Sequence, residues 1–374
     1  MGSARRIKDT GRTASELVRN SALLKNKYLY VFAENASLRK ENQAKQSVKR
    51  NIWEITMPEK KIFKAEIVSN SEIADGIMKM TLSAPEAAKA ARPGQFANLY
   101  PAADSLILPR PVSICDADPD AGTLTFVYAV VGAGTTEFAA LGSGDFLRVS
   151  SPLGTGFTLP APSGAQSNRA LSNAEPSGAS PVDAGAPDAP SADADEENHT
   201  SVALSAESAA EYEQSAPLHA VLIGGGVGTA PMLFLAKELG KRGIRCTAVT
   251  GFRKQPFLSE ELKAAGAKVI TTTDLPTESA FLGTVVDCMK INEIRGDLYF
   301  SCGPRPMLAA VSQYISTFGQ DVQVSLEERM GCGYGACVGC VCDIKELQAD
   351  GSEKLVRKKV CKDGPVFMGS EVVW

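Results

Sequence analysis

Residues 221–232 read Val-Leu-Ile-Gly-Gly-Gly-Val-Gly-Thr-Ala-Pro-Met, an apolar strand followed by a glycine loop and the start of a helix that extends through Leu239. This order is what a dinucleotide-binding loop requires, because a helix N-terminus attracts phosphate and glycines let the backbone approach it. The stretch departs from the usual glycine fingerprint, since Ala230 and Pro231 occupy the region of the third glycine. An ordinary strand-to-helix turn is the alternative. We interpret three glycines as nucleotide-binding residues: Gly224, Gly226 and Gly228.

Downstream of this loop, strand and helix patterns alternate. A helix pattern covers residues 258–265, and strand patterns cover residues 245–250, 268–272, 297–301 and 322–326. Such alternation predicts a parallel α/β layer. Residues 302–307, Cys-Gly-Pro-Arg-Pro-Met, end one strand and start a helix. Because parallel strands place their carboxyl ends at the ligand crevice, Cys302 and Gly303 should face the same nucleotide as the glycine loop.

Upstream, residues 60–151 read as short strands separated by Pro, Gly and Asp clusters. The strand patterns lie at 64–68, 77–82, 95–100, 123–131 and 145–150. Several short strands at this spacing predict a small antiparallel β-barrel. The only helix expected in this region covers residues 135–141.

Two motifs in the barrel region favour a second bound nucleotide. Residues 110–113, Arg-Pro-Val-Ser, follow an apolar strand and a proline-bounded turn, and Arg offers a two-pronged fork to a pyrophosphate. Residues 132–136, Gly-Ala-Gly-Thr-Thr, precede a short helix whose N-terminus is suited to anions. A strand-end turn explains the tetrapeptide alone more often than not, but the two motifs together favour a binding site.

Five of the nine cysteines fall in the last 43 residues. The spacing Cys-x4-Cys-x2-Cys, followed after 20 residues by another Cys, is the plant-type pattern for a [2Fe–2S] cluster. Neighbouring glycines permit the tight loop that such a cluster needs. A zinc site and disulfides are the alternatives to a cluster. Cys342 is an additional thiol that could compete as a ligand, but the spacing favours Cys340. Cys115, Cys246 and Cys288 are expected to be buried. The candidate cluster ligands are Cys332, Cys337, Cys340 and Cys361.

Composition and charge bound the class of protein. The chain has 374 residues with 44% hydrophobic residues and a net charge of −4, which excludes a fibrous protein and gives no case for nucleic-acid binding. No apolar run is long enough to span a membrane, and we expect a cytoplasmic protein. Residues 1–56 carry a net charge of +7 and residues 161–216 carry −9. The predicted segments are a basic extension (1–56), a barrel domain (57–160), a disordered insertion (161–216), an α/β domain (217–325) and a cluster-binding tail (326–374).

The order of these motifs resembles the ferredoxin–NADP reductase superfamily, which pairs an FAD-binding β-barrel with a nicotinamide-binding α/β domain. Residues 151–157, Ser-Pro-Leu-Gly-Thr-Gly-Phe, are similar to the segment that closes the barrel in that superfamily. The tail narrows the resemblance. Residues 325–337 and 360–367 look like the electron-transfer subunits of dihydroorotate dehydrogenase B.

The resemblance implies an electron relay in pyrimidine biosynthesis. An FMN-containing catalytic subunit would oxidise dihydroorotate, and electrons would pass through the [2Fe–2S] cluster and FAD to NAD⁺, in a heterotetramer with two copies of each chain. No residue of this chain is implied as catalytic. Ala129 stands where we expect a basic residue, so its contact would be through the backbone. The implied FAD contacts are Arg110, Pro111, Val112, Ser113, Val127, Tyr128, Ala129, Gly134 and Thr135.

Other functions stay open at this point. One is a flavin and iron–sulfur subunit of a ferredoxin-linked NADH:NADP oxidoreductase or of a sulfhydrogenase, whose tails look similar. An oxygenase reductase is disfavoured, because a plant-type ferredoxin domain needs more than the residues of this tail. A redox-sensing or scaffold protein would have no functional flavin site. The choice between NAD and NADP is also open, since Arg253 and Lys254 follow the second strand and suit a 2′-phosphate.

Overall fold

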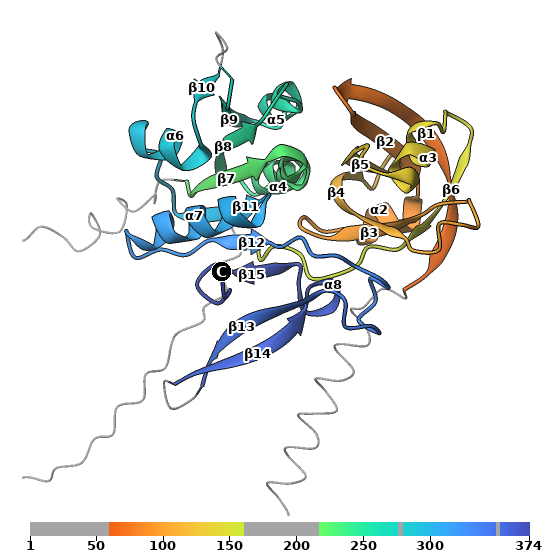
Figure 1. Ribbon diagram of the computed structural model, residues 1–374. Helices are drawn as coiled ribbons and strands as arrows, with labels where there is room; N and C mark the ends of the chain where they lie inside the picture. The colour runs from red at the N-terminus through yellow and green to blue at the C-terminus, as the bar shows by residue number, and fades with distance from the viewer. Residues whose placement is uncertain (1–59, 161–216, 276–279, 349–351) are drawn as a thin grey trace, which may run out of the picture. The chain divides into compact units, whose positions relative to one another are not determined.

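The computed structural model describes residues 60–160, 217–275, 280–348 and 352–374. The predicted extension 1–56, the insertion 161–216 and the first residues of the expected barrel domain, 57–59, lie outside the described residues. The described residues form a closed six-stranded barrel, a seven-stranded sheet with helices, and a two-stranded hairpin (Figure 1). The predicted fold class is confirmed: a multidomain α+β chain with an antiparallel barrel, a parallel α/β layer and a small C-terminal subdomain.

The barrel closes in the strand order β1-β2-β5-β4-β3-β6, and β6 pairs back onto β1. Every neighbouring pair is antiparallel. Along β2 the buried residues Met78, Met80 and Leu82 alternate with partly exposed ones, as a strand with one face in the core requires. The strands are β1 (Ile62–Ala74), β2 (Ile77–Ser83), β3 (Phe96–Tyr100), β4 (Arg110–Asp118), β5 (Thr123–Ala129) and β6 (Phe146–Ser150).

Two sequence expectations for the barrel were wrong. The stretch before Arg110 is not a strand: its apolar residues Ile107 and Leu108 are exposed, and Arg110 itself opens β4, where it pairs with Leu99 of β3. The barrel region also has a second helix, α2 (Pro85–Ala90), besides α3 (Ala133–Ala139). Six residues are too few to show a helical period in the sequence, so α2 was not predicted. In the structure its alanines Ala87 and Ala88 are buried.

The α/β layer has the strand order β10-β9-β8-β7-β11-β12-β15. All neighbouring pairs are parallel except β12 with β15, which comes from the tail. The strands are β7 (His219–Gly225), β8 (Arg245–Phe252), β9 (Ala267–Thr273), β10 (Phe281–Leu282), β11 (Leu298–Cys302), β12 (Gln323–Ser325) and β15 (Val366–Met368).

Helices cover both faces of this sheet (Figure 1). Helices α4 (Ala230–Gly240) and α5 (Ser259–Ala264) lie on the face that packs against the barrel, where Cys115 and Val127 join their core. Helices α6 (Val285–Ile291) and α7 (Arg305–Ser316) pack on the other face. Among the described helices, none is long and apolar enough to cross a membrane. The prediction that three cysteines are buried is confirmed for Cys115, Cys246 and Cys288.

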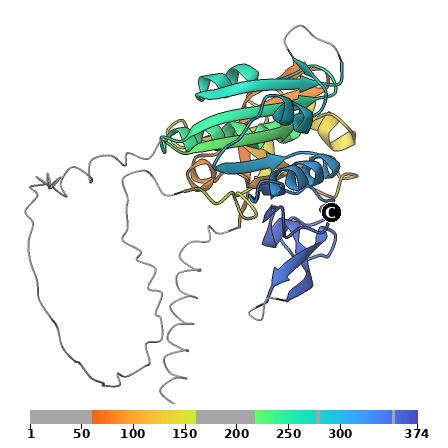
Figure 2. The same cartoon turned by 90° about the vertical axis from the view of Figure 1, so that its left-hand side faces the viewer.

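Strand β15 of the tail joins this sheet, whereas the rest of the tail forms a separate hairpin that projects from it (Figure 2). After Ser325 the chain forms the hairpin β13 (Val341–Leu347) and β14 (Glu353–Lys359), the short helix α8 (Val360–Asp363) and then β15. Its buried apolar side chains share one core with strands β7 and β8 of the α/β layer. So short a tail cannot bury a core of its own, and the core that it shares with the α/β layer supports it.

Candidate functional site

The four candidate cluster ligands come from two places in the tail. Cys332, Cys337 and Cys340 belong to residues 331–340, here called the cluster loop, and Cys361 lies in α8. The Cys337 N–H lies 3.4 Å from the Cys332 sulfur, and the Cys361 N–H lies 3.5 Å from the Cys340 sulfur. The Val360 N–H donates to the Cys340 carbonyl oxygen at 2.8 Å, which fixes α8 beside the loop. The sequence-distant cysteine is thus brought to the other three.

The thiols form two pairs, Cys332 with Cys337 and Cys340 with Cys361. Within the described ranges, no three Cys, His, Asp or Glu side chains converge on one point as a single metal ion would require. A [2Fe–2S] cluster takes four thiolates, two on each iron, and so needs two neighbouring pairs. A tetrahedral zinc site needs four ligands around one ion. Two adjacent thiol pairs fit the two irons of a [2Fe–2S] cluster.

Backbone N–H groups surround the first sulfur. Burial raises the pKa of Cys332, but hydrogen bonds from the N–H groups of Cys337, Tyr334 and Ala336 outweigh it and lower the pKa to about 6. Such donors favour the thiolate that binds a metal. Burial and the neighbouring Cys340 raise the pKa of Cys361 to about 12. The loop is already arranged to accept negative charge on one of its sulfurs.

The extra thiol is placed differently. Cys342 lies inside β13, opposite Lys358 of β14, and its side chain is buried in the shared core. In the described tail, the backbone N–H contacts to sulfur reach Cys332 and Cys340. The ligand set Cys332, Cys337, Cys340 and Cys361 stays a prediction from the spacing.

Strand β3 of the barrel contacts the cluster loop directly. The side-chain amide of Asn98 donates to the Cys332 carbonyl oxygen at 3.0 Å, and the hydroxyls of Tyr100 and Tyr334 are 3.1 Å apart. Asn98 is also the partner of Pro111 across the β3–β4 ladder. The Arg-Pro-Val-Ser motif and the cluster loop therefore both contact strand β3.

Asn98 and Tyr100 are functional candidates that sequence analysis missed. The segment 95–100 read as an ordinary apolar strand. The one available signal was Asn98 itself, because a fully buried amide in a strand needs a partner and so indicates a special contact. Its Oδ1 atom remains without a hydrogen-bond partner.

The two motifs expected to bind the flavin do come together. The guanidinium of Arg110 lies over Gly134, so close that a Cβ atom at Gly134 would be 2.7 Å from Nε. Arg110 also donates to the Leu108 carbonyl oxygen at 2.6 Å. In the first turn of α3, the Thr135 hydroxyl accepts from the N–H groups of Val131 and Gly132, which precede the helix. A positive side chain thus faces a helix N-terminus, which is a suitable arrangement for a pyrophosphate.

The other residues implied as FAD contacts differ in how deeply their side chains are buried. Pro111, Val112 and Ser113 are partly exposed on β4, as is Ala129 at the end of β5. Val127 and Tyr128, in contrast, direct their side chains into two different cores. The Tyr128 hydroxyl donates to Asn70 at 3.4 Å, and its ring packs edge-on against Phe138. Val127 and Tyr128 can therefore offer a ligand only backbone groups.

The two loops of the α/β layer touch each other. Strands β7 and β11 are adjacent, with Gly224 opposite Cys302, so both loops leave the same edge of the sheet. A Cβ atom at Gly228 would collide with the carbonyl group of Cys302, and one at Gly303 would lie 3.1 Å from Gly225. Gly226 has a φ of +54° and no neighbour within 4 Å, so it faces open space. Gly226 is thus the candidate glycine with room for a ligand.

Two buried polar atoms beside these loops lack partners. They are the hydroxyls of Thr229, which follows the glycines, and Ser301, which precedes Cys302. Both side chains are fully buried in the structure, so these hydroxyls lie inside the fold and do not line the crevice. Lys254, which we considered for a 2′-phosphate, instead pairs with Asp75 of the barrel at 2.7 Å.

Comparison with known proteins gives the family. Residues 327–373 match the family described as the iron-sulfur cluster binding domain of dihydroorotate dehydrogenase B. The chain is 35% identical over 312 residues to the dihydroorotate dehydrogenase B (NAD⁺) electron transfer subunit of Listeria monocytogenes serotype 4a, covering 82% of this chain and 97% of the relative. The chain belongs to this family. The same subunit of Bacillus caldolyticus is 34% identical, with 82% and 96% covered.

A solved structure also resembles the chain. It is described as an NADH-dependent reduced ferredoxin-NADP oxidoreductase in a study of flavin-based electron bifurcation. Its TM-score is 0.59 with 25% sequence identity, over 83% of this chain and 90% of the other. This likeness is compatible with the alternative considered from the sequence, but it does not support it better than the family assignment. The chain is an oxidoreductase subunit of the electron-transfer type, with FAD, a [2Fe–2S] cluster and NAD as its cofactors.

Proposed function

We propose that this chain accepts electrons from an FMN-containing subunit that oxidises dihydroorotate and delivers them to NAD⁺. The observation that carries the proposal is the position of strand β3. Asn98 on this strand bonds to the carbonyl of a cluster cysteine and pairs with Pro111 of the flavin motif. One strand thus supports both redox sites, and short separations are what electron transfer needs.

Each proposed role falls to specific residues. Cys332, Cys337, Cys340 and Cys361 hold the cluster, which supplies one-electron transfer when bound. Arg110 and Gly134 receive the FAD pyrophosphate, and Gly226 lines the nicotinamide nucleotide site. The chain's own residues bind and orient these groups, because the cofactors carry the redox chemistry.

The division of labour between two subunits provides the test. The purified chain with its cofactors should reduce an artificial dye with NADH but should not oxidise dihydroorotate, because its described residues include no site identified for that acid. Addition of the FMN subunit should restore transfer from dihydroorotate to NAD⁺, in a complex that contains two copies of each chain. Oxidation of dihydroorotate by this chain alone would contradict the proposal.

Two cysteine variants serve as a matched pair in the same assay. Cys337→Ser should lose the electron paramagnetic resonance (EPR) signal of the reduced cluster and abolish the coupled reaction, while NADH–dye activity survives. Cys288→Ser, a buried cysteine of α6, should keep both the signal and the coupled reaction. Stoichiometric zinc in the wild-type chain would refute the cluster assignment.

The alternative function is tested by exchanging the partner. The likeness to the ferredoxin-NADP oxidoreductase is compatible with a chain that works with ferredoxin and NADP(H). Our proposal predicts that ferredoxin and NADPH do not replace the FMN subunit and NADH. The proposed role further places the protein in the cytoplasm, in pyrimidine biosynthesis.

A further inference from the structure

Lys359 reaches the cluster loop from the end of strand β14. Its ammonium donates a 2.6 Å hydrogen bond to the carbonyl oxygen of Gly335. Its backbone N–H donates to a carboxylate oxygen of Asp363 at 2.7 Å, which holds the residue at the start of α8. The side chain is half-buried, and Cys361 follows two residues later. Lys359 therefore links the helix that carries one cluster ligand to the loop that carries the others.

The Gly335 carbonyl that accepts this bond belongs to the peptide group whose N–H, that of Ala336, acts on the Cys332 sulfur. In a planar trans peptide, the carbonyl and the following N–H point in opposite directions. The N–H on the far side of the Gly335 carbonyl is that of Ala336, which lowers the pKa of Cys332. The next N–H along the chain, that of Cys337, contacts the Cys332 sulfur at 3.4 Å. By holding the carbonyl, Lys359 aims the Ala336 N–H at the sulfur.

Gly335 is the residue at which this peptide would otherwise rotate. Its φ of +83° is one that glycine adopts most easily, and glycine has the most backbone freedom to lose. The stem of Lys362 fills the place where a Cβ atom of Gly335 would lie, with Cδ at 2.8 Å. Two lysines thus restrain one glycine, and only Lys359 does so with its charged group.

The charge of Lys359 acts in the same direction as its hydrogen bond. Four thiolates carry four negative charges, and reduction of a cluster adds one more. A cation held at the loop stabilises the reduced form, as do N–H groups directed at the sulfurs. The neighbouring Lys358, in contrast, pairs with Glu346 across the hairpin.

We propose that Lys359 is a positioning residue that raises the reduction potential of the bound [2Fe–2S] cluster by orienting the Gly335–Ala336 peptide and by its charge. The inference rests on the ligand set proposed above.

The test is a redox titration of the full-length chain followed by EPR, with iron and sulfide content measured in parallel. Lys359→Met should retain the cluster, and at the wild-type midpoint its ratio of reduced to oxidised cluster should fall at least threefold, which is about 30 mV for a one-electron couple. Lys359→Gln keeps a hydrogen-bond donor without the charge and should show a smaller fall. Lys359→Arg should stay within about 1.5-fold of wild type.

Lys358→Met is the matched control, because it changes the net charge equally in the adjacent residue. It should leave the midpoint unchanged. The inference is overturned if Lys359→Met keeps the wild-type midpoint, or if Lys358→Met shifts it equally. If Lys359→Met fails to assemble a cluster, the comparison of Lys359→Gln with Lys359→Arg decides, and equal midpoints overturn the inference. A wild-type chain without a two-iron cluster would refute the proposed function instead.

Discussion

At the scale of single residues, the candidate glycines have different tasks. Three of them leave no room for a side chain, because other parts of the chain lie against them. Thr229 lies against Gly224, the Cys302 carbonyl against Gly228, and the Gly225 backbone against Gly303. Gly226 has open space in front of it, and Gly134 lies under the Arg110 guanidinium. A glycine motif in a sequence therefore indicates that other atoms lie close to the backbone there. It does not distinguish a bound ligand from another part of the protein.

Gly134→Ala tests whether Gly134 and the Arg110 guanidinium over it form part of the proposed flavin site. Alanine favours a helix over glycine by about 0.5–1 kcal/mol, so α3 should not be destabilised. The added methyl group would, however, displace the Arg110 guanidinium from its position over residue 134. We expect FAD to bind at least tenfold more weakly, as measured by recovery of flavin fluorescence on release, with an unchanged melting temperature of the apoprotein.

Gly132→Ala is the control in the same loop. A Cβ atom at Gly132 has no neighbour within 4 Å, so FAD affinity should stay within about twofold of wild type. Equal affinities of the two variants would show that Arg110 does not contact the flavin.

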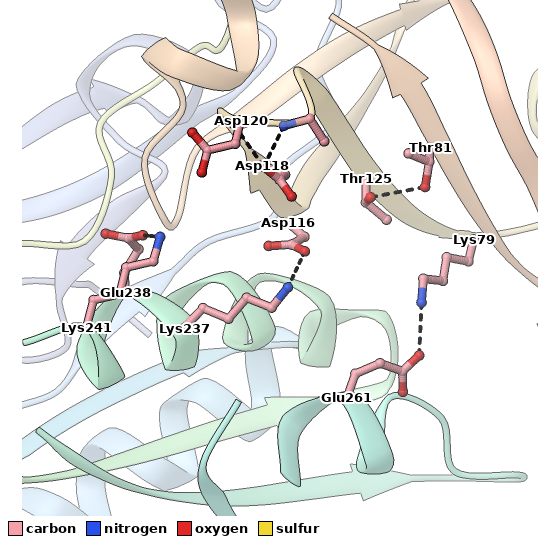
Figure 3. Close-up of polar contacts among 11 residues, drawn as sticks. Lys79, Thr81, Asp116, Asp118, Asp120, Thr125, Lys237, Glu238, Lys241 and Glu261 are labelled. Atoms are coloured by element: carbon pink, nitrogen blue, oxygen red, sulfur yellow. Dashed lines mark hydrogen bonds and ion pairs between the residues drawn. The ribbon is translucent and has the colours of Figure 1, made fainter. Parts of the chain in front are cut away.

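At the scale of elements, helix α4 packs between the barrel and the sheet of the α/β layer. Eight of its 11 residues are buried, because the sheet lies on one side and strand β4 on the other. Its cation Lys237 reaches Asp116 of β4, and Lys79 of β2 reaches Glu261 of α5 at 2.9 Å (Figure 3). These ion pairs join elements that the sequence places more than 100 residues apart.

The pair between Lys237 and Asp116 should stabilise the packing of α4 on the barrel. We expect a double-mutant cycle with Lys237→Met and Asp116→Asn to give a coupling free energy of about 0.5–1 kcal/mol in urea unfolding at low salt. The coupling should shrink at high salt, because both groups are partly exposed.

The Lys254–Asp75 pair offers the comparison. Both side chains are largely exposed, so the same cycle there should give a coupling near zero. A larger coupling for this exposed pair than for Lys237 with Asp116 would contradict the argument from burial.

At the scale of the whole described molecule, the tail is part of the α/β core. Phe367 of β15 lies opposite Val324 of β12 and shares a core with Val221 and Ile223 of the central strand. The segment after the barrel is joined to the tail as well, since the Thr155 N–H donates to the Gly364 carbonyl oxygen at 2.6 Å. The cluster site is therefore built on the folded α/β layer.

Phe367→Ala tests this shared core. Loss of a buried Phe side chain should lower the free energy of unfolding of the α/β helices by about 3 kcal/mol, measured by urea unfolding with circular dichroism. Leu355→Ala, an exposed residue of β14 in the same tail, should change it by less than about 0.5 kcal/mol. If Phe367→Ala affected only cluster binding, the tail would be an independent module.

The sequence by itself determined the fold class, and it predicted the cysteine set and the two nucleotide loops. Each of these depends on local chemistry: a strand period, a Cys spacing, or glycines before a helix. It missed α2 and the true start of β4, since six helical residues have no visible period and the apolar Ile107 and Leu108 proved to be exposed. The contacts that connect the sites were decided only by the tertiary structure. Asn98 meets Cys332, and Arg110 meets Gly134, because barrel closure and the packing of the tail bring distant segments together, and no local pattern records such proximity.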